Sequence, residues 1–166
     1  MSTDPGGTSF EDMPDKFKTP EICLEALKQK SLALKYVPEA MKTEALCLEA
    51  VQHSGSALEY VPEAMKTEAV CLAAVQENGF SLKYIPENMK TEALCLAAVQ
   101  NKESMPAFGK FSIYLKKVSS VLEYVPEAMK TEAICLAAVH QNINALKYVP
   151  EALKAIINKQ VIGKEQ

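Results

Sequence analysis

The chain contains no arginine, since all 18 of its basic residues are lysine, against 21 acidic residues among 166. Arginine reads guanine edges with two hydrogen bonds and enters narrow minor grooves, and the net charge of −3 is unfavourable for phosphate contacts. We therefore expect no nucleic-acid partner.

Long apolar runs are also missing. Residues 1–18 are rich in glycine, proline and acidic residues and lack the apolar core of a secretory signal. No stretch reaches the roughly eighteen apolar residues that a membrane span requires. The sequence therefore predicts no membrane contact and a cytoplasmic location. Delivery into a host cell without a classical signal peptide stays open.

A 24-residue pattern occurs five times, and this repeat decides the architecture. Successive tyrosines of a Tyr-Val/Ile-Pro-Glu motif are 24, 24, 40 and 24 residues apart, and one cysteine precedes each of them. Five repeats therefore run over residues 19–154, with sixteen extra residues in the fourth, at about 103–118. The tyrosines are Tyr36, Tyr60, Tyr84, Tyr124 and Tyr148, and the cysteines are Cys23, Cys47, Cys71, Cys95 and Cys135.

The first block of a repeat, residues 43–52 in the second copy, predicts an α-helix. Thr43 is a suitable N-terminal cap, and in the first repeat the cap Thr19 precedes Pro20, which is preferred at the first helical position. One apolar face follows, made of Leu46, Cys47, Ala50 and Val51. This face predicts the buried side of the helix.

The second block, residues 57–66, predicts a shorter helix. Leu58 and Val61 lie on one side of it before Pro62 prevents a regular continuation. We expect a short α- or 3-10 helix followed by a one-turn segment. A glycine between the two blocks, Gly55 or Gly79, suits a left-handed end of the first helix.

Neither helix is long enough to be stable alone in water, so neighbouring repeats must supply the core. The sequence predicts an all-α fold, a right-handed α-solenoid of five two-helix repeats spaced about 8–10 Å apart. Residues 1–18 are expected to form a flexible tail or cap, and 155–166 a capping helix or tail. Residues of alternating sign precede the tyrosines and predict a charge ladder that survives the insertion: Lys35, Glu59, Lys83, Glu123 and Lys147.

The motif Thr-Glu-Ala-x-Cys-Leu-Ala-Ala-Val-Gln, followed by Leu-Lys/Glu-Tyr-Val-Pro-Glu-Ala-Met-Lys, resembles a family of bacterial tandem repeats catalogued as a domain of unknown function. These repeats often occur in suspected secreted effectors. The resemblance covers residues 19–154 and implies a helical scaffold for interactions, with no enzyme activity or site residues to transfer. The 24-residue length is also similar to that of leucine-rich variant repeats, and the insertion departs from the simple tandem pattern.

No pattern points to an enzyme, a metal or a cofactor. Cysteines about 10 Å apart cannot converge on one zinc ion, so we interpret them as small buried apolar residues in a reducing compartment. The two histidines, His53 and His140, fall at predicted helix ends and are interpreted as solvated. Each repeated glutamate lies three residues before a lysine, which predicts a surface ion pair rather than an acid/base pair: Glu63–Lys66, Glu87–Lys90 and Glu127–Lys130.

The insertion is one candidate binding element. Its apolar residues Phe108, Phe111, Leu115 and Val118, with Leu122, follow the spacing of an amphipathic helix, and Pro106 lies near its start. Aromatic and basic side chains that anchor a partner are Phe108, Lys110, Phe111, Tyr114, Lys116 and Lys117. Packing of this stripe on the chain's own solenoid is the equally weighted alternative.

A second candidate surface consists of positions that vary between near-identical repeats, because solenoids recognise partners through such positions. It includes His53, Glu77, Asn101 and Gln141, although solvent exposure alone explains the same variation. The sequence favours a protein-binding adaptor or an effector-like inhibitor. A self-assembling structural protein, such as a homodimer, is the second hypothesis, and an unrecognised enzyme is the third.

Overall fold

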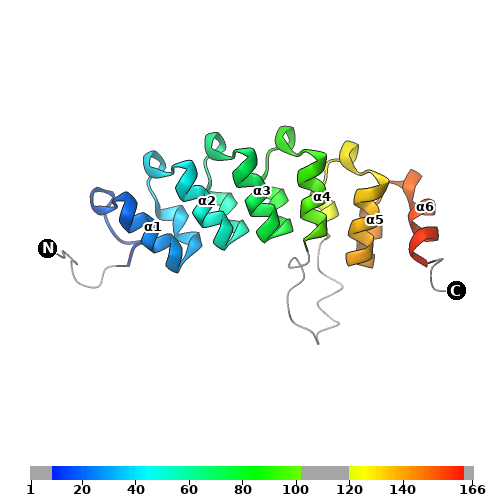
Figure 1. Ribbon diagram of the computed structural model, residues 1–166, viewed down its shortest axis with the longest axis horizontal. Helices are drawn as coiled ribbons and strands as arrows, with labels where there is room; N and C mark the ends of the chain where they lie inside the picture. The colour runs from blue at the N-terminus through cyan, green and yellow to red at the C-terminus, as the bar shows by residue number, and fades with distance from the viewer. Residues whose placement is uncertain (1–8, 102–119, 163–166) are drawn as a thin grey trace, which may run out of the picture. The chain divides into compact units, whose positions relative to one another are not determined.

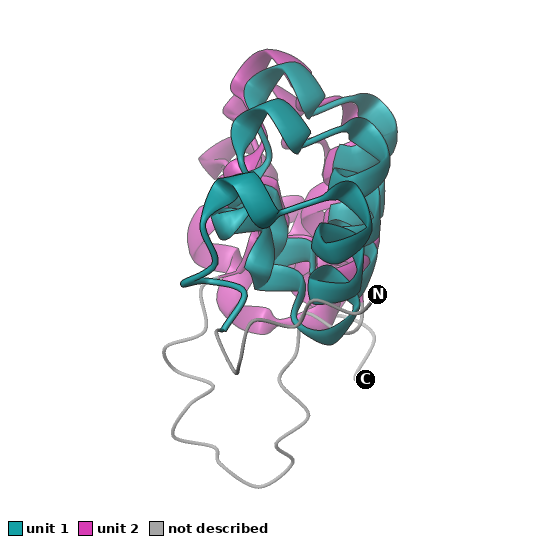
Figure 2. Ribbon diagram, turned by 90° about the vertical axis from the view of Figure 1, so that its left-hand side faces the viewer, with its two compact units in different colours: residues 1–74 teal, residues 75–166 magenta. Residues whose placement is uncertain are grey.

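The structure is a computed structural model that describes residues 9–101 and 120–162, and every regular element in these two ranges is a helix. The chain divides into two compact units, Met1–Ala74 and Val75–Gln166, which are coloured separately in Figure 2. Within each unit, helices pack against the helices of the neighbouring repeat. The predicted all-α repeat solenoid is therefore confirmed.

One α-helix begins each repeat, and a sixth follows the last repeat (Figure 1). The threonine before each repeat helix caps it, because its hydroxyl accepts a hydrogen bond from the amide three residues later at 3.3–3.4 Å. The predicted caps Thr19 and Thr43 and the first-turn Pro20 are confirmed. The helices are α1 (Pro20–Gln29), α2 (Glu44–His53), α3 (Glu68–Glu77), α4 (Glu92–Gln100), α5 (Glu132–Gln141) and α6 (Glu151–Ile162).

The second helix of every repeat is a 3-10 helix that ends at the repeat tyrosine. The next residue precedes a proline, which disfavours the α conformation, and Val61 accordingly adopts φ −80° and ψ 126°. The chain therefore leaves this helix in an extended conformation. The 3-10 helices are η2 (Ser31–Tyr36), η4 (Gly55–Tyr60), η6 (Gly79–Tyr84), η9 (Val121–Tyr124) and η11 (Ile143–Tyr148).

A single 3-10 turn follows most of the prolines, as the sequence predicts. In the second repeat the amide of Met65 donates to the carbonyl of Pro62 at 2.8 Å, which closes the turn. The five turns are η1 (Asp15–Phe17), η3 (Glu39–Met41), η5 (Glu63–Met65), η7 (Glu87–Met89) and η10 (Glu127–Met129).

The predicted left-handed glycine at the end of the first helix is wrong. Helix α2 ends at Ser54, which is extended with φ −157° and ψ 108°, and Gly55 is already the first residue of η4. Gly55 and its equivalent Gly79 are buried. The extended residue turns the chain directly into the 3-10 helix, and a residue without Cβ fits the buried start of that helix.

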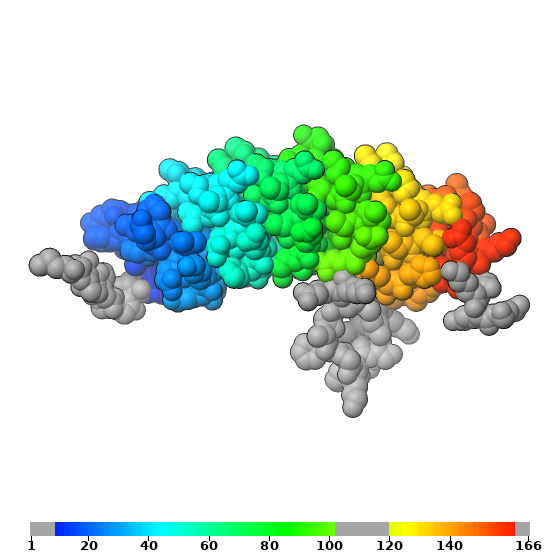
Figure 3. Space-filling model, viewed as in Figure 1, coloured from blue at the N-terminus to red at the C-terminus, as the bar shows by residue number. Residues whose placement is uncertain are grey.

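The core of unit 1 lies between its α-helices and its 3-10 helices. All four residues of the predicted apolar face of α2 are buried, and Leu34 and Leu58 of the 3-10 helices are completely buried. Helix α2 contacts both η2 and η4, so the core is shared between two repeats. Figure 3 shows the side chains of these neighbouring repeats in continuous contact.

Unit 2 repeats this arrangement. Helix α4 packs against α5, α5 packs against α6, and η9 lies between η6 and η11. Leu82 and Leu122 are completely buried, as are Cys95 and Cys135. Leu122 therefore belongs to the repeat core. Among the helices described, none combines the length and apolar character that a membrane crossing needs.

Candidate functional surface

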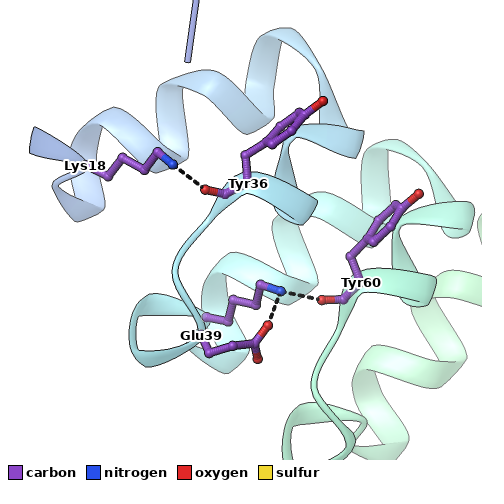
Figure 4. A network of polar contacts seen from close by, with 5 residues as sticks. Lys18, Tyr36, Glu39 and Tyr60 are labelled. Carbon is purple, nitrogen blue, oxygen red and sulfur yellow. Dashed lines mark hydrogen bonds and ion pairs between the residues drawn. The ribbon is translucent and has the colours of Figure 1, made fainter. Parts of the chain in front are cut away.

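One lysine directly follows each of the five single 3-10 turns. Four of these lysines are buried, and the fifth is nearly so. The Nζ atoms of three of them donate to the main-chain carbonyl of a repeat tyrosine: Lys18 to Tyr36 at 2.8 Å, Lys42 to Tyr60 at 3.0 Å and Lys90 to Tyr124 at 3.0 Å. Figure 4 shows the contacts of unit 1. We call the five residues the clamp lysines: Lys18, Lys42, Lys66, Lys90 and Lys130.

An acidic residue three positions earlier neutralises each clamp lysine. The ammonium of Lys66, for example, lies 2.7 Å from the carboxylate of Glu63. The lysine side chains are only 5–11% exposed, whereas their acidic partners are 71–73% exposed. The predicted pairs are therefore formed, but the expectation that they are surface pairs is wrong for the lysines. A buried ammonium requires such partners, and the carbonyl of the next tyrosine is one of them.

The insertion leaves this contact unchanged in unit 2. Lys18 and Lys42 reach a carbonyl 18 residues further along the chain, while Lys90 reaches Tyr124, 34 residues away. The difference is the length of the insertion. The third and fourth repeats are therefore in contact on either side of the insertion, through Lys90 and Tyr124 and through η6 and η9. At Lys130, the structure places the ion pair with Glu127 but no carbonyl bond within the part of the chain that it describes.

The N-terminal residues contain a clamp that the sequence reading missed. Lys18 lies 2.9 Å from Asp15 and is as buried as Lys42. Asp15 and Phe17 occupy the positions at which the other copies have glutamate and methionine, so the motif differs from the repeat consensus. The spacing Pro14-x-x-x-Lys18-Thr19 is nevertheless that of Pro38, Lys42 and Thr43 and was the available signal.

The clamp fixes the backbone of a tyrosine whose ring remains at the surface. Each repeat tyrosine is partly exposed, and Figure 4 shows the rings of Tyr36 and Tyr60 extending to the same side, away from the clamp. Lysine ammoniums lie over several of the rings, at 4.4 Å for Lys35 on Tyr36 and 4.5 Å for Lys147 on Tyr148. The side chains thus form a polar, aromatic surface on the 3-10 helices.

In unit 2 the ring of Phe80 meets that of Tyr124 edge to face at 6.5 Å between centroids. The hydroxyl of Tyr148 donates to the carboxylate of Glu123 at 2.6 Å. This hydroxyl, together with the charge of Glu123, raises the pKa of the Lys147 ammonium. Aromatic and charged groups of neighbouring repeats are therefore coupled along unit 2.

The predicted charge ladder is not formed by direct ion pairs between Lys35 and Glu59 of unit 1, although the structure describes both residues. Lys35 interacts instead with the tyrosine beside it, and the Tyr36 hydroxyl is the main cause that raises the pKa of Lys35. An ammonium above a ring remains in contact with water on the side away from the ring, so little of its hydration is lost in this contact.

All five cysteines are buried and reduced, which confirms their interpretation as core residues. Burial raises the pKa of every thiol, and for Cys47 and Cys95 to about 11. The ionised, reactive form is therefore scarce at neutral pH. Over residues 9–101 and 120–162, no group of three acidic, histidine or cysteine side chains is placed to hold a metal ion.

The predicted partner-binding residues fall into two groups. His53 is exposed and contacts Glu49 at 3.2 Å, while Glu77 and Gln141 are partly exposed at helix ends. The amide of Asn101 donates to the carbonyls of Val75 and Gln76 at 2.9 and 2.7 Å, so it closes the end of α3. The remaining residues lie outside the described ranges: Phe108, Lys110, Phe111, Tyr114, Lys116 and Lys117.

Part of the repeat array matches a known family model. Residues 44–90 match the family model described as a domain of unknown function, DUF4116. The matched segment begins with α2 and ends at Lys90, so it covers two consecutive repeats and two clamp turns. Neither a curated protein nor a solved structure matches the chain.

Proposed function

We propose that the chain is a protein-binding repeat scaffold and that a protein partner docks on the repeat tyrosines of the 3-10 helices. The observation that carries this proposal is the pairing of a fixed backbone with an exposed ring. Lys90 holds the carbonyl of Tyr124 at 3.0 Å, while the Tyr124 ring lies partly exposed beside Phe80. A pre-positioned ring loses little conformational entropy when a partner covers it.

The chemistry of this surface suits a protein better than a nucleic acid. Tyrosine is enriched among the residues that contribute most to protein–protein affinity. The neighbouring charges alternate between lysine and glutamate rather than forming a basic patch, and such alternation gives register and specificity. Continuous phosphate contacts would need a surface of one sign.

An adaptor and an effector-like inhibitor would use this surface in the same way. They differ in whether the partner remains active once it is bound. The inserted segment, residues 103–118, stays a predicted second contact on the strength of its aromatic and lysine content. Cytoplasmic location and delivery into a host cell likewise stay expectations from the sequence.

The test begins with the identification of a partner by affinity purification on the intact chain, followed by calorimetric titration. A Tyr124→Ala/Tyr148→Ala variant should weaken binding at least tenfold, because each lost ring removes on the order of 1 kcal/mol. The matched control is Tyr124→Phe/Tyr148→Phe, which keeps both rings. Unchanged affinity in a folded double alanine variant would reject docking on the tyrosines. Deletion of residues 103–118 separately tests the predicted contact of the insertion.

Self-assembly is the second candidate function, because large apolar side chains are exposed near both ends of the described chain. Phe17 and Ile22 are exposed in unit 1, and Ile143 and Ile156 in unit 2. Contacts between copies through such residues would make the molecular mass depend on concentration. Light scattering over a dilution series checks this, and a constant monomer mass excludes the candidate.

A further inference from the structure

Exposed charged residues of alternating sign precede the repeat tyrosines, and the structure adds one more at the N-terminal side. Glu11 lies three residues before a proline, as Lys35 does. A hydrogen bond from the Tyr36 hydroxyl is the largest cause that lowers the pKa of Glu11. Glu123 accepts from the Tyr148 hydroxyl in the same way. In chain order the exposed charges are Glu11, Lys35 and Glu59 in unit 1, and Lys83, Glu123 and Lys147 in unit 2.

The two units carry complementary rows of charge. The signs are negative, positive, negative in unit 1 and positive, negative, positive in unit 2, so every charge of one row meets its opposite in the other. Each row reads the same in both directions, and the match therefore holds for parallel and for antiparallel rows. Lys35 and Glu123 are the middle members, which face each other in either orientation.

Apolar contact area lies beside these charges. Tyr36 and Tyr60 are partly exposed, with their rings on the same side in Figure 4. Leu32 of η2 is 39% exposed and precedes Lys35 by three residues, which places both on the same side of a 3-10 helix. Phe80, which is partly exposed, holds the same position in η6. Both units thus combine aromatic and aliphatic groups with charges, as protein interfaces do.

The contacts that the charges make within one chain are compatible with further pairing. The ammoniums of Lys35 and Lys147 lie over neighbouring tyrosine rings at 4.4 and 4.5 Å. An ammonium has three donors and a carboxylate about four acceptor positions, so the bond from Tyr148 to Glu123 does not saturate that carboxylate. Side chains that are already held in place lose little conformational entropy when they pair.

We propose that the charged, tyrosine-lined face of unit 1 binds that of unit 2 in a second copy of this chain. Neighbouring charges of a row are one repeat apart, about 8–10 Å, and another copy has the same spacing by construction. An unrelated partner would have to reproduce both this spacing and the alternation of sign. A two-fold dimer forms the contact twice, with Lys35 of each copy against Glu123 of the other. The proposal rests on the docking surface proposed above and names its partner.

The oligomeric state of the full chain is the first test. Sedimentation equilibrium should show a dimer that dissociates on dilution and with added salt, because exposed ion pairs are screened. Measurements up to about 300 µM detect a contact with a Kd on the order of 100 µM. A monomer mass over this whole range at low salt would overturn the proposal. A foreign partner that still requires Tyr124 and Tyr148 would then leave the function proposed above intact.

Charge reversal at the middle pair tests the surface itself. Lys35→Glu and Glu123→Lys should each weaken dimerisation at least tenfold, since each variant places like charges opposite one another at both contacts. An equimolar mixture of the two variants should dimerise as the parent does, because every reversed charge meets an opposite charge. Lys28→Glu makes the same change in net charge at an exposed lysine of α1, and it should dimerise normally. Circular dichroism confirms that each variant is folded.

The outcomes separate this proposal from the others. Dimerisation that both reversals leave unchanged would overturn it and favour contacts through the exposed apolar residues near the ends of the described chain. Two folded monomeric variants whose mixture does not dimerise would also overturn it, because complementary charges predict rescue. A dimer that depends on the charge pair but is unchanged in Tyr124→Ala/Tyr148→Ala would support the paired rows and reject docking on the rings.

Discussion

The ammonium of Lys42 donates to the main-chain carbonyl of Tyr60, 18 residues further along the chain, at 3.0 Å. Between these two residues lies the whole of α2, so one hydrogen bond joins the turn of one repeat to the end of the next 3-10 helix. Glu39 supplies the compensating charge. The contact couples nearest neighbours, which is the kind of interaction that sets the stability of repeat proteins.

Replacement of Lys42 by methionine should lower the free energy of unfolding by about 2 kcal/mol. The change keeps a long apolar stem but removes a charge-assisted hydrogen bond and leaves the Tyr60 carbonyl without its donor. Urea unfolding followed by circular dichroism measures the effect. Lys28→Met, at an exposed lysine of α1, is the control and should change the free energy by less than about 0.5 kcal/mol. Equal effects of the two substitutions would contradict a role of the clamp in stability.

Substitution of Ser81 by alanine should stabilise the protein by about 1 kcal/mol. The Ser81 hydroxyl is buried and makes no hydrogen bond to any residue that the structure describes, and the equivalent residues Ala33, Ala57 and Ala145 carry no hydroxyl. Burial of an unsatisfied hydroxyl costs about 1–3 kcal/mol. The midpoint of urea unfolding should therefore rise. The reverse change at the matched position, Ala57→Ser, should destabilise by a similar amount, and a Ser81→Ala midpoint at or below the parent value would contradict this account.

The stability should fall in alkaline solution because of the buried thiols. Burial raises the pKa of Cys47 and Cys95 from the ordinary 9.0 to about 11, so between these values the unfolded chain releases protons that the folded chain keeps. Such a group contributes stability that is present below pH 9 and is lost as the pH rises toward 11. Each thiol should account for about 1 kcal/mol at pH 10.

Urea titrations at pH 7 and pH 10 measure this loss. A Cys47→Ala/Cys95→Ala variant keeps all the tyrosines and lysines, which also titrate in this range, and should lose about 2 kcal/mol less than the parent between the two pH values. An identical loss in the parent and the variant would show that the two thiols are not responsible.

Much of the local structure could be predicted because it depends on neighbouring residues. The threonine caps and the apolar face of α2 follow directly from the spacing of Thr43, Leu46 and Val51. The role of Lys42 could not be predicted in this way. Lysine is rarely buried, so a lysine three residues after a glutamate predicts an ion pair at the surface. The group that stabilises the buried ammonium is the Tyr60 carbonyl, which lies in the next repeat.

The exposed surface of the repeat tyrosines could be predicted only in part, because it too depends on contacts between repeats. The tyrosines were visible as a repeated motif, but their exposure depends on how Lys90 holds the next 3-10 helix against its neighbours. Variation between the repeats predicts that Asn101 is a surface residue, whereas its amide donates hydrogen bonds to carbonyls of α3 in the preceding repeat. Contacts between repeats depend on how far apart and at what angle neighbouring repeats pack. The pattern of residues within one repeat does not specify that geometry.

Two of the three threonine caps of unit 1, Thr43 and Thr67, should differ in their contribution to stability. Both Thr43 and Thr67 accept a hydrogen bond from the amide three residues later at 3.4 Å, but the Thr67 hydroxyl also donates to the Glu44 carboxylate of the preceding repeat at 2.7 Å. Pro20 stands at the position equivalent to Glu44 in the first repeat, so Thr43 has no such acceptor there. Thr43→Ala should cost about 1 kcal/mol, the usual value for a cap, and Thr67→Ala up to about 1 kcal/mol more.

A double-mutant cycle separates the two roles of Thr67. Unfolding free energies of Thr67→Ala, Glu44→Ala and the double variant should give a coupling of about 0.5–1 kcal/mol, the range for neighbouring groups that share a hydrogen bond. The same cycle with Thr43 in place of Thr67 should give none, because Thr43 and Glu44 are not bonded through their side chains. Equal costs for the two threonines, with no coupling to Glu44, would mean that the hydroxyl stabilises its own helix and contributes nothing to the contact between repeats.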